Sequence, residues 1–335
     1  MKKYKSTDYL FASANIKGKE KYLLSHEKVE KMLESKTPED ALKVLYELNY
    51  GDGMEEVAAR DFETLLQIEH AKAYDNVMSV APQKEYFVVF RYPSDYHNVK
   101  ALLKAEFMGT DATELLTETG SIPSETLADL VRNRNYLAMR PEMARGIREV
   151  IDTFGTSQDP QSVDLILDKA CYADMNKTVA KLNNAFIKGY VSLLIDTTNL
   201  KSFVRARGME KSWDFFSKIF IDGGSISERT FIAGYEEPLE QFADKLTAYG
   251  LEDVLTEGAA MLKETGRYTA LEKLCDNAIL DYAKDAKYIA IGIQPLVGYL
   301  VAKEYEIKTA RIIMAGKLAG LSPDRIRERV RDTYV

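Results

Sequence analysis

The 335-residue sequence is poor in the residues that catalysis and metal binding use most often. It contains two cysteines, three histidines and one tryptophan. The histidines, His26, His70 and His97, are too scattered to suggest a metal site, and the chain has neither Cys-x-x-Cys nor His-Glu-x-x-His. Phosphate loops, dinucleotide-binding glycine turns and nucleophile elbows are also missing. The missing motifs disfavour an enzyme, with an unrecognised acid–base site as the alternative, and we predict no catalytic residues, no cofactor and no metal.

Long apolar runs and an excess of basic charge are missing as well. The longest uncharged run, residues 289–302, is too short to span a bilayer, and we expect it to form a buried helix pair broken at Pro295. The N-terminus lacks the apolar segment of a signal peptide, which predicts a cytoplasmic protein. A net charge of −7 argues against a general nucleic-acid binder.

The most informative feature that is present is an element that recurs three times. It has the pattern Asp-x-x-Asn-apolar-Lys at residues 95–100 and 196–201, and a looser copy occupies residues 303–308. The second copy follows the first by 101 residues, and the third follows after 107. Cys171 lies 28 residues before Asn199 of the second copy and Cys275 lies 31 residues before Glu306 of the third, so they occupy equivalent positions. We predict that both are buried free thiols, because equivalent positions in separate lobes are normally far apart.

A helix-start signature recurs four times along the chain. It consists of an apolar residue, a serine or proline suited to a cap or first turn, and usually an acid in that turn. It occurs at residues 24–29, 122–127, 226–231 and 321–326, and glycine-containing turns precede the last three. Three starts belong to the three repeats. The surplus start at the C-terminus is expected to pack back against the N-terminal lobe.

Helical periodicity dominates the rest of the sequence. Apolar residues in 29–48 and 62–71 recur at spacings of three and four, typical of one helix face. Residues 86–90 resemble a strand, but helix-like residues take their place in the second repeat. We predict an all-α fold of three pseudo-symmetric helical lobes, residues 1–120, 121–224 and 225–335, the last with a C-terminal helix. Trp213, Phe215, Phe216 and Phe220 have helical spacing and are predicted to be core residues.

The repeated element has two interpretations. In the structural one, Asn98 or Asn199 binds local backbone where two helices meet, while Lys100 or Lys201 extends outward. In the functional one, three similar helices surround a central space whose polar and basic side chains hold an axial partner. The basic stretch 303–331 likewise has two interpretations, a solvated helix face or a contact surface for an acidic partner or anionic headgroups.

Several segments resemble one known family. Residues 295–322, which begin Pro-Leu-Val-Gly-Tyr-Leu-Val-Ala-Lys-Glu-Tyr-Glu, closely resemble the C subunits of the V-type/A-type ATP synthases, a family that includes the d subunit of the vacuolar ATPase. The ending at residues 326–335, the N-terminal segments 9–17 and 23–25, and the elements at 95–100 and 196–201 are similar to it too. The resemblance covers essentially the full chain.

The resemblance implies a non-catalytic central-stalk (rotor) subunit of a V-type/A-type rotary ATPase. Three lobes would form a funnel-shaped body that caps the membrane proteolipid ring and receives the central axle subunits. It would couple them for H+ or Na+ transport linked to ATP synthesis or hydrolysis. The protein would be a monomer within a hetero-oligomeric complex, cytoplasmic and peripheral on the inner face of the membrane. Lys100, Lys201, Lys308 and Arg311 are then predicted to face the axle cavity. The alternative is a soluble helical adaptor that binds proteins without a rotor.

Overall fold

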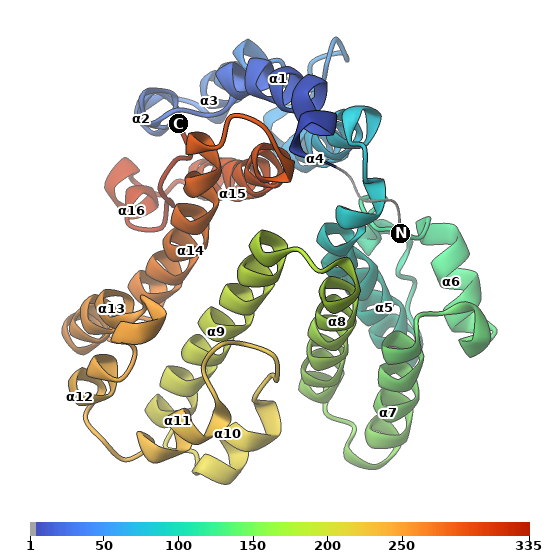
Figure 1. Ribbon diagram of the computed structural model, residues 1–335, viewed down its shortest axis with the longest axis vertical. Coiled ribbons are helices and arrows are strands. Elements are labelled where there is room, and N and C mark those ends of the chain that lie inside the picture. Colours follow the sequence, from blue (N-terminus) through green and yellow to red (C-terminus); the bar gives the residue numbers. More distant parts are fainter. Residues whose placement is uncertain (1–4) are drawn as a thin grey trace. The chain divides into compact units, whose positions relative to one another are not determined.

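The computed structural model describes residues 5–335 (Figure 1). It is 75% helical, and the described residues contain no strand, which confirms the predicted all-α class. The helices divide into two compact units, each described by itself below. Unit 1 comprises the residues up to Gln83 together with Glu236–Val335, and unit 2 comprises Lys84–Tyr235. The three-lobe boundaries and the funnel shape stay predictions.

Unit 1 is built from two separate stretches of the chain, and unit 2 from one. The helices of unit 1 are α1 (Leu10–Lys19), α2 (His26–Glu34), α3 (Pro38–Glu47), α4 (Phe62–Val80), α12 (Leu239–Asp244), α13 (Glu252–Thr265), α14 (Thr269–Lys284), α15 (Ile293–Leu318) and α16 (Pro323–Arg327). Those of unit 2 are α5 (Tyr92–Met108), α6 (Ser124–Arg132), α7 (Pro141–Ser157), α8 (Pro160–Leu182), α9 (Ala185–Gly208), α10 (Trp213–Ile219) and α11 (Glu228–Ala233). The segment with strand-like sequence forms the 3-10 turns Lys84–Tyr86 and Val88–Arg91.

All four predicted helix starts are confirmed. The hydroxyl groups of Ser25, Ser227 and Ser322 each accept a hydrogen bond from the backbone N–H three residues later, as an N-cap does. The remaining start begins α6 at Ser124 and has no side-chain cap. These starts depend on bonds between near neighbours in the sequence, which explains why they were predictable.

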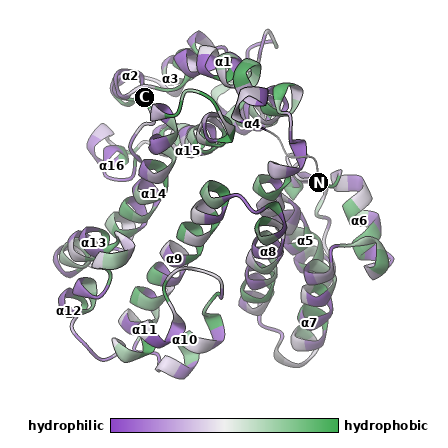
Figure 2. Cartoon of the chain, in the orientation of Figure 1, coloured by the Kyte–Doolittle hydropathy of each residue, from purple (hydrophilic) through white to green (hydrophobic). Residues whose placement is uncertain are grey.

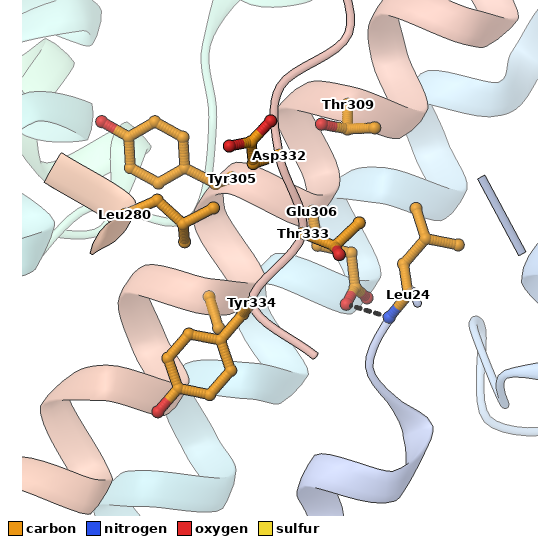
Figure 3. A pocket seen from close by; sticks show the side chains of 9 residues that line it. Leu24, Leu280, Tyr305, Glu306, Thr309, Asp332, Thr333 and Tyr334 are labelled. Atoms are coloured by element: carbon orange, nitrogen blue, oxygen red, sulfur yellow. Dashed lines mark hydrogen bonds between the residues drawn. The ribbon is translucent and has the colours of Figure 1, made fainter. Parts of the chain in front are cut away.

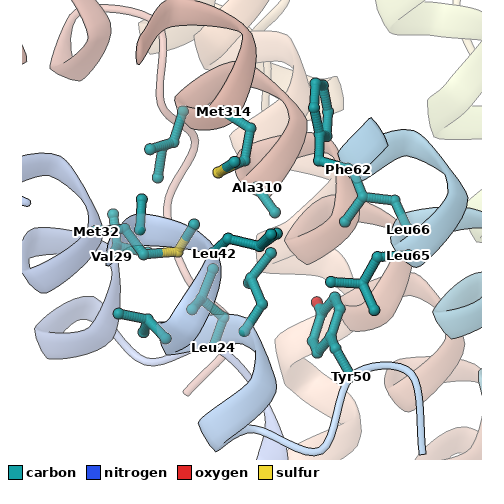
Figure 4. Packing of buried hydrophobic residues seen from close by; sticks show 14 of the residues in the cluster. Leu24, Val29, Met32, Leu42, Tyr50, Phe62, Leu65, Leu66, Ala310 and Met314 are labelled. Carbon is teal, nitrogen blue, oxygen red and sulfur yellow. The ribbon is translucent and has the colours of Figure 1, made fainter. Parts of the chain in front are cut away.

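The core of unit 1 lies where α2, α3 and α4 meet α15 (Figure 4). Burial of large aliphatic side chains supplies most of the stabilisation, about 1.5–3 kcal/mol for each one fully removed from water. The short helix α16 packs on α2, where Arg327 contacts Glu30 at 2.9 Å and Glu34 at 2.7 Å. The C-terminal helix start therefore packs back against N-terminal helices, as predicted. Buried members of this core include Val29, Met32, Leu42, Phe62, Leu65, Leu66, Ala310 and Met314.

In unit 2, α8 packs against both α5 and α7, while α9 packs against α10 (Figure 1). An aromatic cluster fixes the second contact, because the ring of Phe203 lies 5.3–5.5 Å from the rings of Phe216, Phe231 and Tyr235. Phe216 is fully buried as predicted. The prediction for Trp213 was wrong, since its side chain is 47% exposed. Trp213 is the first residue of α10, and the residues on both sides of it, 211–212 and 214, are exposed as well, so the helix begins at the surface of the unit.

The expected break at Pro295 was also wrong. One continuous helix, α15, runs from Ile293 to Leu318, and Pro295 lies in its first turn, where a missing backbone N–H breaks no helical hydrogen bond. Cys171 and Cys275 are buried free thiols, as predicted, and burial raises the pKa of Cys171. Within residues 5–335, none of the helices has the length and apolar character that crossing a membrane requires.

Candidate functional site

Asn98 and Asn199, the centres of the first two repeated elements, are fully buried and bridge backbone. Asn98 donates from Nδ2 to the carbonyl oxygen of Thr117 (2.8 Å), and its Oδ1 accepts from the N–H of Thr117 (2.9 Å). Asn199 makes the same two bonds with Ile221, at 2.8 and 2.9 Å. The side-chain amide thus satisfies a donor and an acceptor of loop backbone that is not paired within a helix. The structural interpretation of the asparagines is confirmed.

Asp95 and Asp196 lie one helical turn before the asparagines and hold the next helix start. The N–H of Ile122 donates to Asp95 Oδ1 (3.1 Å), and the N–H of Ile226 donates to Asp196 Oδ1 (3.0 Å). The other carboxylate oxygen accepts from the preceding serine, from its hydroxyl in the first copy (2.5 Å) and from its N–H in the second (2.9 Å). Residues 95–98 and 196–199 therefore each hold a loop and a helix start together, and we name them the Asp–Asn clasps.

The recurring glycines before the helix starts are explained by these clasps. A Cβ atom on Gly120 would collide with the Asp95 carboxylate, and one on Gly224 would collide with that of Asp196. The backbone must approach this closely for the next two residues to reach the carboxylate, through a hydroxyl and an N–H after Gly120 and through two N–H groups after Gly224. Glycine is thus required by close contact at both positions.

The two clasps differ in their counter-charge. Asp95 forms an ion pair with Arg140 (2.9 Å), which also contacts Asp174 (3.1 Å) and lies 4.0 Å above the ring of Tyr92. Burial by itself lowers the pKa of Arg140, but the two carboxylates outweigh it and raise the pKa above its ordinary value. Asp196 forms no ion pair within residues 5–335, and burial raises its pKa although backbone N–H groups oppose the shift. Sequence reasoning missed Arg140, because no local pattern marks it.

The third copy also holds a helix start, but the carboxylate that does so belongs to Glu306, which takes the place of the asparagine. The backbone N–H of Leu24 donates to Glu306 Oε2 (2.6 Å; Figure 3). The hydroxyl of Tyr50 donates to Oε1 of the same carboxylate (2.5 Å). Leu24 is the apolar residue of the first helix start, equivalent to Ile122 and Ile226. A helix near the C-terminus thus holds a helix start near the N-terminus, 282 residues away in sequence.

Lys303, which takes the aspartate position in this copy, is buried among acids. Its Nζ lies 2.8 Å from Glu69 and 2.7 Å from Glu306, and Lys72 lies 2.5 Å from Glu69 on the outer side. Burial by itself lowers the pKa of Lys303, but Glu306 and Glu69 raise it above its ordinary value. Burial also raises the pKa of Tyr50, and Glu306 adds to the shift. Removing one partner of such a buried pair costs about 3–5 kcal/mol, so the cluster locks α4 to α15.

Two of the four predicted partner-binding cations form ion pairs between neighbouring helices. Lys100 on α5 places Nζ 2.5 Å from Asp168 on α8. Lys308 on α15 places Nζ 2.5 Å from Asp276 on α14. Both pairs are partly exposed, so each contributes at most about 1 kcal/mol to stability.

Arg311 and Lys201 complete the set. Arg311 on α15 makes a two-point contact with Glu63 on α4, with Nε at 2.7 Å and Nη2 at 3.0 Å. Lys201 on α9 is half-buried and forms no ion pair in the part of the chain that the structure describes. The structure thus engages three of the four cations within their own units and leaves Lys201 without an acidic partner.

The remaining basic residues of the stretch 303–331 are partly explained by internal contacts. Lys317 donates to the carbonyl oxygens of Leu33 (2.9 Å) and Ser35 (2.6 Å), which lie at the C-terminal end of α2. Arg331 is buried and contacts Asp276 at 2.8 Å. These cations therefore join the C-terminal segment to the rest of unit 1.

The buried charged groups of these sites join helices and loops to one another. Among residues 5–335, no three His, Cys, Asp or Glu side chains converge as metal ligands do. The buried charged groups described above face one another or backbone amides. What they accomplish chemically is the fastening of loops and helix starts to long helices.

Comparison with known proteins places this protein in a family. The model of the ATP synthase (C/AC39) subunit family matches residues 12–329. The chain is 25% identical to the C subunit of the V-type sodium ATPase of Enterococcus hirae, over 95% of this chain and 97% of that protein. It is 27% identical to the C subunit of the A-type ATP synthase of Methanocaldococcus jannaschii (95% and 85% covered) and 22% identical to the C subunit of the V-type ATP synthase of Thermus thermophilus (96% and 98%).

The chain belongs to the ATP synthase (C/AC39) subunit family. The resemblance seen in the sequence is thereby confirmed over nearly the full chain. The protein is a non-catalytic rotor-stalk subunit, a structural part of a hetero-oligomeric V/A-type ATPase complex.

Proposed function

We propose that this chain couples the central axle subunits of the rotary ATPase to the proteolipid ring in the membrane. The coupling links ATP synthesis or hydrolysis to the transport of H+ or Na+. The protein has no active site of its own and lies on the cytoplasmic, inner face of the membrane. The observation that carries the proposal is the family match over residues 12–329, which reaches into both units.

The clasps and the buried ion pairs support a mechanical role. A part that transmits torque must resist deformation, and close-packed helices joined by buried hydrogen bonds and ion pairs do so. In each repeat a carboxylate on a long helix holds the backbone of a helix start, at 3.1, 3.0 and 2.6 Å. This recurrence supports the further proposal that three lobes, residues 1–120, 121–224 and 225–335, form a funnel around the axle.

We further propose that Lys100, Lys201, Lys308 and Arg311 line the axle cavity. The side chains of Lys308 and Arg311 are 41% and 46% exposed, so part of each is accessible to a partner despite its ion pair. Substitution of Lys201 tests this placement most directly, because Lys201 forms no ion pair among the described residues that the change would break.

The first experiment is a tagged pull-down of this chain from gently solubilised native membranes, with the co-purifying subunits identified by mass. Recovery of the axle subunits together with the proteolipid ring is the expected result. Recovery of soluble proteins without the ring would refute the rotor role and favour the helical adaptor instead.

A charge reversal tests the axle contact separately. Lys201→Glu is expected to weaken binding of purified axle subunits by about tenfold or more, as loss and repulsion of one interfacial charge would cause. Lys263→Glu, at an exposed position of α13, is the matched control and is expected to bind normally. Equal binding by both variants would contradict the placement of Lys201 at the axle, while leaving the family assignment intact.

A further inference from the structure

Five large apolar side chains of unit 1 are exposed in two neighbouring segments. The first turn of α1 presents Leu10 (58% exposed) and Phe11 (71%). The loop before α15 presents Tyr288 (87%), Ile289 (38%) and Ile291 (37%). Single exposed apolar residues are common on proteins, whereas clustered ones mark a contact surface. We name these five residues the α1–loop patch.

Contacts between the two segments show that they lie side by side. The hydroxyl of Ser13 both donates to the carbonyl oxygen and accepts from the N–H of Gly292, each at 3.2 Å, and Lys17 Nζ donates to the carbonyl oxygen of Lys287 (3.4 Å). Leu10 lies three residues before Ser13, so both are on the same stripe of α1. The loop therefore runs along this stripe of α1, which Figure 2 shows with hydrophobic and hydrophilic residues mixed.

The surroundings of the patch are basic, although the protein as a whole is acidic. Residues 5–22 and 281–291 contain six lysines against four acidic residues, while the full chain carries a net charge of −7. Glu20 pairs with Lys17 (3.1 Å) and Asp281 with Lys284 (2.8 Å). The lysines outside these pairs are Lys5, Lys19, Lys21 and Lys287, against Asp8 and Asp285. The surface that accompanies the patch is therefore complementary to negative charge.

We propose that the α1–loop patch contacts the surface of a lipid bilayer that contains anionic headgroups. Phe11 and Tyr288 are aromatic residues of the kind that enter the interfacial region, and the apolar side chains beside them supply buried area. Long lysine side chains, such as Lys19 and Lys21, reach the headgroup phosphates while their methylene groups stay on the apolar side. This contact is separate from the coupling role proposed above, because the chain would make it without any other subunit.

The test uses the isolated full chain and protein-free vesicles of phosphatidylcholine, with and without phosphatidylglycerol, in a co-sedimentation assay. Binding is expected only to vesicles that contain phosphatidylglycerol, and it should weaken as salt is added, because exposed charges are screened. The double change Lys19→Glu and Lys21→Glu is expected to weaken binding by about 25-fold or more, from about fivefold for each lysine lost.

Apolar variants separate insertion from simple charge attraction. The double change Phe11→Ser and Tyr288→Ser is expected to reduce binding by about tenfold or more, because that apolar area no longer leaves water. Leu137→Ser, at a 99% exposed leucine of unit 2, is the matched control and should bind like the unchanged protein.

Absence of binding to anionic vesicles would overturn the proposal, and so would equal binding by the patch variants and the control. Either result leaves the rotor role standing, because that role is tested by recovery of the ring and axle subunits. Conversely, a pull-down that recovers no ring or axle subunits would not contradict binding of the patch to vesicles.

Discussion

Replacement of Asn199 by alanine removes the two hydrogen bonds that hold Ile221 in place. Asn199 is completely buried, and the backbone N–H and carbonyl oxygen of Ile221 both lose their partner. A buried polar group left unpaired costs about 1–3 kcal/mol. Two such groups predict a loss of roughly 2–6 kcal/mol in the free energy of unfolding, a large part of what a typical domain has.

Urea unfolding followed by tryptophan fluorescence measures this loss directly. Trp213 is the only tryptophan of the chain and lies in unit 2, in the helix between Asn199 and Ile221 in sequence. The unfolding midpoint of Asn199→Ala is expected at a clearly lower urea concentration than that of the unchanged protein. Asn98→Ala should behave similarly, because the geometry of its two bonds with Thr117 is the same.

The matched control is Ser202→Ala on the same helix. Ser202 is half-buried, and its hydroxyl forms no hydrogen bond within residues 5–335, so its replacement should change stability by about 0.5 kcal/mol or less. If Asn199→Ala shifted the midpoint no more than this control, the reasoning that the clasp holds the loop would be refuted.

Two further predictions concern glycine packing and acid stability. Gly224→Ala should destabilise unit 2 in the same urea assay, because the new Cβ collides with Asp196. The control Gly155→Ala should be neutral or stabilising by up to about 1 kcal/mol, since its Cβ meets no atom within 4 Å. Equal effects of the two changes would contradict the close-contact argument. Lys28 and Lys31 hold the pKa of Glu47 at about 2 by hydrogen bonds, below its ordinary value of 4.5, so its contribution is present above pH 4.5 and lost as the pH falls toward 2. Glu47→Gln should therefore reduce the loss of stability over that pH range, measured by circular dichroism, and an unchanged pH profile would contradict the assignment.

The sequence by itself determined the class of fold and most of the helix starts. Ser25, Ser227 and Ser322 cap helices through bonds that span three residues, and the apolar spacing of each helix is equally local. The Asp-x-x-Asn pattern left two interpretations open, and the structural one, in which Asn98 and Asn199 bind backbone, is confirmed. The aspartate contacts were not predicted, although the glycine–serine turns before the helix starts were a signal that could have indicated them.

Only the tertiary structure decided which distant groups complete each site. Arg140 becomes the counter-charge of Asp95, and Glu306 receives an N–H from Leu24, 282 residues away. Lys303 is part of a basic stretch in the sequence, yet it is buried between two glutamates. A sequence pattern specifies what a residue does with its neighbours along the chain. Burial and electrostatic pairing depend instead on which helices pack together in space, and that packing also left Trp213 exposed and the loop before α15 uncovered.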